Sequence, residues 1–110
     1  MKLPAIKRGE IWLVNLDPTL GSEIQKTRPC VVVSPSEMHD FLRTVMVAPM
    51  TTGSRPAPYR VAVRHADKDG LILLDQIRTI DKVRLVKRLG ALPSATLHSV
   101  LVTLAEIFAE

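Results

Sequence analysis

The chain has 110 residues, 46% hydrophobic and 24% charged, a composition typical of one globular domain and unlike that of a disordered segment. We therefore expect a single domain over residues 1–110. No apolar run approaches the roughly 20 residues of a membrane span, and the first residues lack the apolar stretch of a secretory signal. The sequence thus predicts a cytoplasmic protein with no membrane partner.

Fifteen Lys and Arg against eleven Asp and Glu give a formal net charge of +4. This charge favours polyanionic partners without establishing one, because many basic proteins never bind nucleic acid. The chain has one Trp, one Tyr and two Phe, whereas proteins that bind single strands without sequence preference usually stack bases on several aromatic rings. The composition disfavours a binding surface built on stacking alone.

The first two predicted strands flank a long loop. Residues 10–16 (EIWLVNL) are β-branched and aromatic, apolar on both faces, and bounded by a glycine and an Asp-Pro pair. Residues 29–34 (PCVVVS) are too short and too β-branched for a helix, and they begin with a proline, which a strand tolerates there. The loop of residues 17–28 is about as long as connections get before a functional role or disorder must explain their length.

A short helix and a third strand are expected next. The segment SPSE at residues 34–37 has capping-box spacing with proline at the first helical position, which predicts a helix from Pro35 to about Arg43. Residues 44–50 (TVMVAPM) are typical of a strand, and glycine and two prolines make residues 51–58 a second loop.

The second half of the chain alternates strands and turns. Residues 59–64 have the period of a strand with Arg60 and Arg64 on its solvent face. A turn cluster at 65–70 precedes a short apolar strand at 71–74, which runs into the polar pair 75–76 and then into residues 77–80 (IRTI).

The last segments are a turn, a strand and a helix. Residues 81–85 suggest one helical turn capped by Asp81, and residues 86–92 a last strand. From Pro93 onward, apolar residues recur at helical spacing, which predicts an amphipathic C-terminal helix. The elements together predict an α+β domain on a curved antiparallel sheet or small SH3-like barrel, with a short helix after the second strand.

Arg28 is the first candidate site residue. It precedes Pro29, which holds its backbone near extended angles, so its guanidinium starts from a rigid strand end. The guanidinium fork fits a phosphate, although the same position suits a solvated arginine or a salt bridge to Glu23.

Thr51, Thr52 and Asp75 are further candidates. The hydroxyl groups can donate to an oxyanion, but threonine is also common in turns because it caps backbone amides. Asp75 lies between apolar segments, and a buried carboxylate needs a cation, for which Arg78 and Arg28 are the expected partners. A purely structural ion pair is an equal alternative.

The remaining motifs exclude several chemistries. His39, His65 and His98 have no metal-ligand spacing around them and are interpreted as structural. Cys30, the single cysteine, can form neither an intramolecular disulfide nor a cysteine cluster for zinc. No P-loop, GxSxG, HExxH or GxGxxG motif is present, so we expect no cofactor and no metal.

Four ordered segments span nearly the whole chain: RGEIWLVNLDPTLGSE at 8–23, TRPCVVVSP at 27–35, VAPMTT at 47–52 and LLDQIRTIDKVRL at 73–85. In order and spacing they resemble the MazF/PemK/Kid family of toxin endoribonucleases, and four motifs together are more specific than any one alone. The resemblance implies the toxin fold shared with CcdB and a homodimeric, metal-independent mRNA interferase. Such a bacterial toxin cuts single-stranded RNA at short motifs, inhibits growth, and is neutralised by a cognate antitoxin.

The resemblance also implies site residues. Arg28 of the TRP motif and Thr51 match the catalytic arginine and threonine, Glu23 the glutamate of the GSE loop, and Asp75 the aspartate of the DQ motif. In one branch of the family, an arginine two residues before that aspartate is assigned as the acid. This chain has Leu73 at that position, so the mechanism based on Arg28 and Thr51 is preferred. Contacts to RNA are expected from Lys26, Thr52, Arg55, Gln76 and Arg78.

The implied reaction uses the 2′-OH of the RNA as nucleophile and gives a 2′,3′-cyclic phosphate and a 5′-OH end. Arg28 would stabilise the phosphorane and Thr51 would hold a nonbridging oxygen. A guanidinium is a poor base, so Glu23 or Asp75 is the better candidate, and this choice stays open. Two alternatives are a CcdB-like toxin that binds gyrase and cleaves nothing, and a non-catalytic SH3-like RNA-binding module.

Overall fold

The computed structural model describes residues 5–110, which form seven strands, three short 3-10 helices and one α-helix. The strands are β1 (Glu10–Asn15), β2 (Thr27–Val32), β3 (Thr44–Thr51), β4 (Arg60–His65), β5 (Lys68–Leu73), β6 (Arg78–Asp81) and β7 (Leu85–Ala91). The helices are η1 (Ser36–Asp40), η2 (Leu74–Gln76), η3 (Lys82–Arg84) and α1 (Ser94–Ile107).

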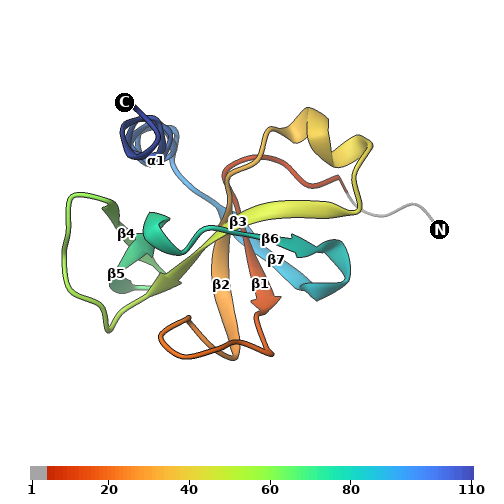
Figure 1. Ribbon diagram of the computed structural model, residues 1–110, viewed down its shortest axis with the longest axis horizontal. Helices are drawn as coiled ribbons and strands as arrows, with labels where there is room; N and C mark the ends of the chain where they lie inside the picture. Colours follow the sequence, from red (N-terminus) through yellow and green to blue (C-terminus); the bar gives the residue numbers. More distant parts are fainter. Residues whose placement is uncertain (1–4) are drawn as a thin grey trace.

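All strand pairings are antiparallel, and the order along the sheet is β4-β5-β3-β2-β1-β7. β3 joins the two parts of the sheet: its first half pairs with β6, and its last residues, Met50 and Thr51, pair with β5. Because sheets twist, the result is a curled half-barrel, with α1 beside β4 at one end (Figure 1). This confirms the predicted curved antiparallel sheet with a C-terminal helix.

The sheet is apolar on both faces, and each face has its own core cluster. Trp12, Val32 and Val47 belong to one cluster, and Ile11 and Val31 to the other. Successive side chains of a strand point to opposite faces, so β1 and β2 supply residues to both clusters. The prediction that the first strand is buried on both sides is therefore confirmed.

The predicted helix over residues 35–43 is wrong in type and length, because only the 3-10 helix η1 forms and no side chain caps it. The Ser34 hydroxyl, predicted to be the cap, instead accepts from the Met46 amide (3.0 Å) and bonds Nε2 of buried His39 (2.6 Å). His39 Nδ1 in turn donates to the Ile6 carbonyl (2.6 Å). The interpretation of His39 as structural is confirmed.

Two other segments differ from the prediction. The turn expected at 65–70 contracts to Ala66-Asp67, both left-handed with φ of 52° and 61°, as in a two-residue hairpin, and β5 begins at Lys68. In α1, Val100 is fully buried, but Phe108 at the end of the predicted apolar stripe is 72% exposed. The predicted cap of the 81–85 turn is confirmed, because Asp81 accepts from the Val83 amide (2.9 Å).

Glu10 is a buried carboxylate that joins β1 to β7. It accepts hydrogen bonds from the Lys7 amide (2.8 Å), the Trp12 indole (3.2 Å) and Nε of Arg88 (2.7 Å). Burial raises the pKa of Glu10, but these hydrogen bonds together hold it below its usual value.

Glu10→Gln should lower the Tm at pH 7 and reduce the fall of the Tm as the pH is lowered. Because the folded pKa lies below the unfolded one, the carboxylate stabilises the fold above the unfolded pKa of about 4.3, and this stabilisation disappears as the pH falls through the folded pKa. Thermal unfolding of both proteins from pH 7 to pH 3 checks this. Parallel curves for wild type and variant would contradict the role assigned to Glu10.

Candidate functional site

Two cavities open beside the end of β3. The first, here called the loop cavity, has a volume of about 380 Å³ and lies against the β1–β2 loop; it is lined by Leu16, Ser22, Glu23, Ile24, Pro49, Asp75, Gln76, Ile77 and Arg78. The second, here called the hairpin cavity, has a volume of about 420 Å³ and lies against the β4–β5 hairpin; its walls include Arg28, Met50, Thr51, Thr52, His65, Lys68 and Gly70.

Arg28 and Thr51 come together in the hairpin cavity. Cys30 pairs with Pro49 and Val31 with Ala48 in the antiparallel ladder of β2 and β3. Continuing this register by two residues places Arg28 opposite Thr51. The two residues that the motifs single out are therefore neighbours across two strands.

Both side chains keep groups that can contact a ligand. Arg28 is half-buried, and its Nε donates to the Gln25 carbonyl (3.2 Å); the alternative of a salt bridge to Glu23 is wrong. The Thr51 hydroxyl oxygen accepts from the Gly53 amide (3.3 Å), which leaves its proton to donate. A guanidinium fork beside a hydroxyl donor suits the oxygens of a phosphate.

Gly70 fixes the position of Thr51. A Cβ at residue 70 would lie 2.8 Å from the Thr51 carbonyl oxygen, so only glycine lets β5 approach the end of β3 this closely. The wall of the hairpin cavity is thus held by backbone contacts.

His65 and Lys68 also line the hairpin cavity, and sequence analysis did not select either for the site. His65 was expected to be structural; instead it lies at the end of β4, opposite Lys68 across the hairpin turn. The lining residues include Arg28, Lys68 and His65 but no carboxylate, so the cavity is suited to an anion. The turn motif HADKDG, with charged residues around a two-residue turn, was the feature of the sequence that could have indicated His65 and Lys68.

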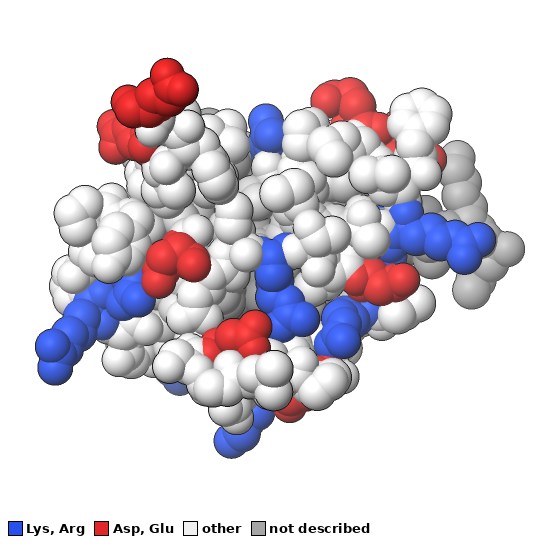
Figure 2. All heavy atoms as spheres, viewed as in Figure 1, with Lys and Arg blue, Asp and Glu red and all other residues white. Residues whose placement is uncertain are grey.

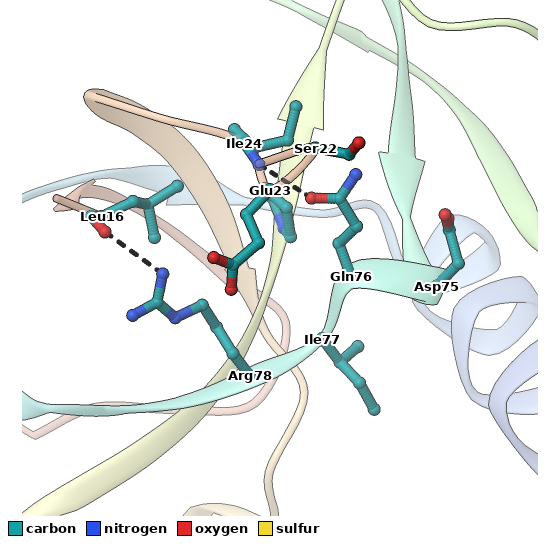
Figure 3. Close-up of a pocket in the computed structure, with 9 residues that line it drawn as sticks. Leu16, Ser22, Glu23, Ile24, Asp75, Gln76, Ile77 and Arg78 are labelled. Carbon is teal, nitrogen blue, oxygen red and sulfur yellow. Dashed lines mark hydrogen bonds between the residues drawn. The ribbon is translucent and has the colours of Figure 1, made fainter. Parts of the chain in front are cut away.

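The loop cavity is held together by side chains that reach across the β1–β2 loop (Figure 3). Oε1 of Gln76 accepts a hydrogen bond from the Ile24 amide (2.9 Å), and Nη1 of Arg78 donates one to the Leu16 carbonyl (3.2 Å). Glu23 accepts the Leu20 amide (2.5 Å), and Figure 3 shows its carboxylate extending toward the Arg78 guanidinium.

The predicted cation partners of Asp75, Arg78 and Arg28, are wrong. Asp75 pairs with Arg60, Nε to Oδ1 at 3.2 Å and Nη2 to Oδ2 at 3.0 Å. Arg60 was expected on the solvent face, but its side chain is only 18% exposed. Because Arg60 stands opposite Leu73 in the β4–β5 register, its side chain reaches η2, which begins at the next residue.

The other predicted RNA contacts divide between the cavities and the surface. Thr52 lines the hairpin cavity, and Gln76 and Arg78 line the loop cavity. Lys26 and Arg55 are exposed and line neither of these two cavities. Figure 2 shows acidic groups interleaved with basic ones on the face in view, so the basic groups of that face do not form one continuous surface.

Cys30 and Leu73 lie beneath the site and are fully buried. Burial raises the pKa of the Cys30 thiol to about 12, although Arg78 opposes this shift, so the thiol stays protonated at neutral pH. Leu73 contributes to the core.

Within residues 5–110 no group of three or more His, Cys, Asp or Glu is placed to hold a metal ion. No helix in the same range is long and apolar enough to cross a membrane.

Comparison with known proteins supports the motif resemblance. A family model described as the PemK-like, MazF-like toxin of type II toxin-antitoxin systems matches residues 7–108. The chain is 41% identical over 108 residues to Endoribonuclease PemK of Escherichia coli, covering 93% of this chain and 81% of that protein. It is 38% identical over 101 residues to Endoribonuclease MazF of Staphylococcus epidermidis, covering 86% and 84%.

Two solved structures have the same fold. MazF from Deinococcus radiodurans has a TM-score of 0.83 at 24% identity, covering 94% of this chain and 96% of that one. A mycobacterial endoribonuclease in complex with its cognate antitoxin has a TM-score of 0.78 at 26% identity, covering 93% of each. Because the family model spans nearly the whole chain and the fold agrees, this protein belongs to the PemK-like, MazF-like toxin family of type II toxin-antitoxin systems.

Proposed function

We propose that this chain is a sequence-specific endoribonuclease toxin that cuts single-stranded RNA, inhibits growth, and is neutralised by a cognate antitoxin. The observation that carries the proposal is the pairing of Arg28 and Thr51 in one cavity that has cationic walls and no carboxylate. The relatives at 41% and 38% identity, both named endoribonucleases, support the same activity.

In the proposed reaction the 2′ oxygen of the RNA bonds to phosphorus, and the bond from phosphorus to the 5′ oxygen breaks. The 2′ proton goes to a base, and the leaving 5′ oxygen gains a proton. The products are therefore a 2′,3′-cyclic phosphate and a 5′-OH end. Arg28 stabilises the negative charge of the phosphorane, and Thr51 donates to a nonbridging oxygen. The nucleophile belongs to the substrate, so we propose that the reaction needs no metal.

Contacts within the site narrow the choice of base between Glu23 and Asp75. Both oxygens of Asp75 are already paired with the guanidinium of Arg60, which favours a role for this carboxylate in holding Arg60. Glu23 has one oxygen bonded to the Leu20 amide and is exposed, which makes it the better candidate of the two. His65 is a second candidate, because it lines the same cavity as Arg28 and Thr51, whereas Glu23 lines the neighbouring one.

Glu23→Gln and His65→Gln should separate these candidates. Loss of the general base lowers kcat by about two orders of magnitude or more, so we expect this loss in one variant and a nearly unchanged kcat in the other. Single-turnover cleavage of one labelled RNA by each variant checks this. If neither substitution slowed cleavage, neither side chain would be the base.

Sequencing the 5′ ends of fragments from a mixed transcript pool tests the proposed activity. We expect cuts at a short recurring motif. Intact RNA together with inhibition of gyrase would support the CcdB-like alternative, and intact RNA retained by the protein would support a non-catalytic RNA-binding module.

We also propose a homodimer whose RNA-binding groove is the landing site of the antitoxin. Lys26, Arg28, Arg55 and Arg78 would contact RNA phosphates, and an acidic antitoxin segment would take their place. The antitoxin complex of the mycobacterial relative supports a partner of this kind.

Inhibition by the antitoxin should therefore be competitive with RNA and weaken as salt rises, as RNA binding itself does. Competition binding at two salt concentrations, with analytical ultracentrifugation at micromolar protein, checks both claims. Unchanged RNA affinity at saturating antitoxin would contradict the shared groove, and a monomer would contradict the dimer.

A further inference from the structure

Arg60 uses all of its guanidinium nitrogens in contacts between separate segments. Nε and Nη2 hold the two oxygens of Asp75, and Nη1 donates to the backbone carbonyl of Arg55 (2.9 Å). The guanidinium also lies 5.7 Å from the centre of the Tyr59 ring. One half-buried side chain thus ties the β3–β4 loop to η2.

The contacts continue from η2 into the other loop. Asp75 and Gln76 are neighbours in η2, and Gln76 accepts the Ile24 amide of the β1–β2 loop (2.9 Å). In Figure 3, Asp75 stands on the far side of Gln76 from Glu23 and Arg78. Arg60 therefore anchors η2 from one side while Gln76 holds the β1–β2 loop from the other.

We propose that Arg60 is a positioning residue that couples the two loops through Asp75 and Gln76, and that it thereby fixes the loop cavity, lined by the expected RNA contacts Gln76 and Arg78, for the selection of RNA bases. This inference rests on the proposed endoribonuclease function. Arg60 acts through η2 and has no role in the chemical step, so its loss should impair selection of RNA more than turnover. Asp75 is then part of the anchor, in place of the catalytic role that its motif implies.

The chemistry of the contact favours a fixed geometry. A bidentate pair of a guanidinium and a carboxylate restrains both partners in orientation as well as distance. The hydrogen bond to Asp75 raises the pKa of Arg60, although burial opposes this shift, so the arginine stays charged at any working pH.

The same hairpin contains a matched control. Arg64 lies on the same face of β4 as Arg60 and pairs with Asp69 of β5 at 2.9 Å, with side chains 62% and 85% exposed. Neither residue lines the loop cavity or the hairpin cavity. Arg64→Gln thus removes an Arg–Asp ion pair from the same strand, here one with a single bond to the carboxylate, without touching the path to Ile24.

Hydrogen exchange tests the coupling without any RNA. In Arg60→Gln we expect the Ile24 amide to exchange about tenfold faster, because η2 loses its anchor and the bond to Gln76 opens more often. In Arg64→Gln the exchange of this amide should match wild type. Equal protection of Ile24 in Arg60→Gln and wild type would overturn the coupling.

Cleavage kinetics test the effect of this coupling on the selection of RNA. For the preferred RNA of the wild-type enzyme, Arg60→Gln should raise KM and reduce discrimination against a one-base variant by about tenfold, with kcat changed less than twofold. Arg64→Gln should keep both KM and discrimination. A loss confined to kcat, or unchanged discrimination, would overturn the positioning role.

Three further variants keep the proposal falsifiable. Asp75→Asn should reproduce the effects of Arg60→Gln, and the double variant should be no worse than either single one, because both break one contact; additive losses would overturn the pairing. If Arg60→Gln does not fold, Arg60→Lys takes its place, since it keeps the charge and loses the bidentate contact. A wild-type protein that cuts no RNA would refute the proposed function, whereas unchanged Ile24 exchange would refute only the coupling.

Discussion

Arg28→Ala should lower kcat for RNA cleavage by about two to three orders of magnitude, the loss typical of removing one oxyanion donor. Arg28 extends from β2 and lines the hairpin cavity together with Thr51, where the phosphorane forms in the proposed reaction. Thr51→Ala should show a loss of similar size. Single-turnover kinetics at saturating RNA would measure both.

The fold should survive these substitutions, because Arg28 and Thr51 are only half-buried and belong to neither core cluster. Lys87→Ala is a suitable control: it removes an exposed cation of β7 that lines neither of the two cavities. Circular dichroism and thermal unfolding verify the fold of each variant. Wild-type rates in Arg28→Ala or Thr51→Ala would refute their assignment to catalysis.

An RNA with a 2′-deoxy sugar at the cut nucleotide should resist cleavage almost completely. Without the 2′-OH, the proposed reaction has no nucleophile and cannot close the cyclic phosphate. The measurement is digestion of matched oligonucleotides that differ at this one sugar, followed by analysis of the fragment ends.

The deoxy substrate should still bind, because phosphate contacts do not depend on the 2′-OH of one nucleotide. It should therefore act as a competitive inhibitor with an affinity close to that of the RNA. Efficient cutting of the deoxy substrate would mean that water attacks phosphorus, and the proposed mechanism would be wrong.

Most of the sheet could be predicted because its signals are local. β-branched runs bounded by Gly and Pro marked β1, β2 and β3, and the apolar period marked α1. The helix after β2 was overestimated because Ser34, a good cap in isolation, is bound by Met46 and His39 instead. Those contacts depend on the packing of β3, which no local pattern contains.

The site was predictable in part. The ordered motifs selected Arg28 and Thr51, and the structure places them in one cavity. The partner of Asp75 was missed because Arg60 comes close to Asp75 only when β4 and β5 pair in their observed register. The division of the predicted residues between two cavities depends on where β3 ends and which strands flank it, which is a property of topology and not of spacing.

We propose that Arg28 and Thr51 form the centre of a ribonuclease that uses the 2′-OH of its substrate. The most direct test is digestion of a single-stranded RNA pool in EDTA by wild type and Arg28→Ala, with the fragment ends identified chemically. We expect discrete fragments with 5′-OH and cyclic phosphate ends from wild type and intact RNA from the variant. Intact RNA with both proteins, equal fragments from both, or 5′-phosphate ends would contradict the claim.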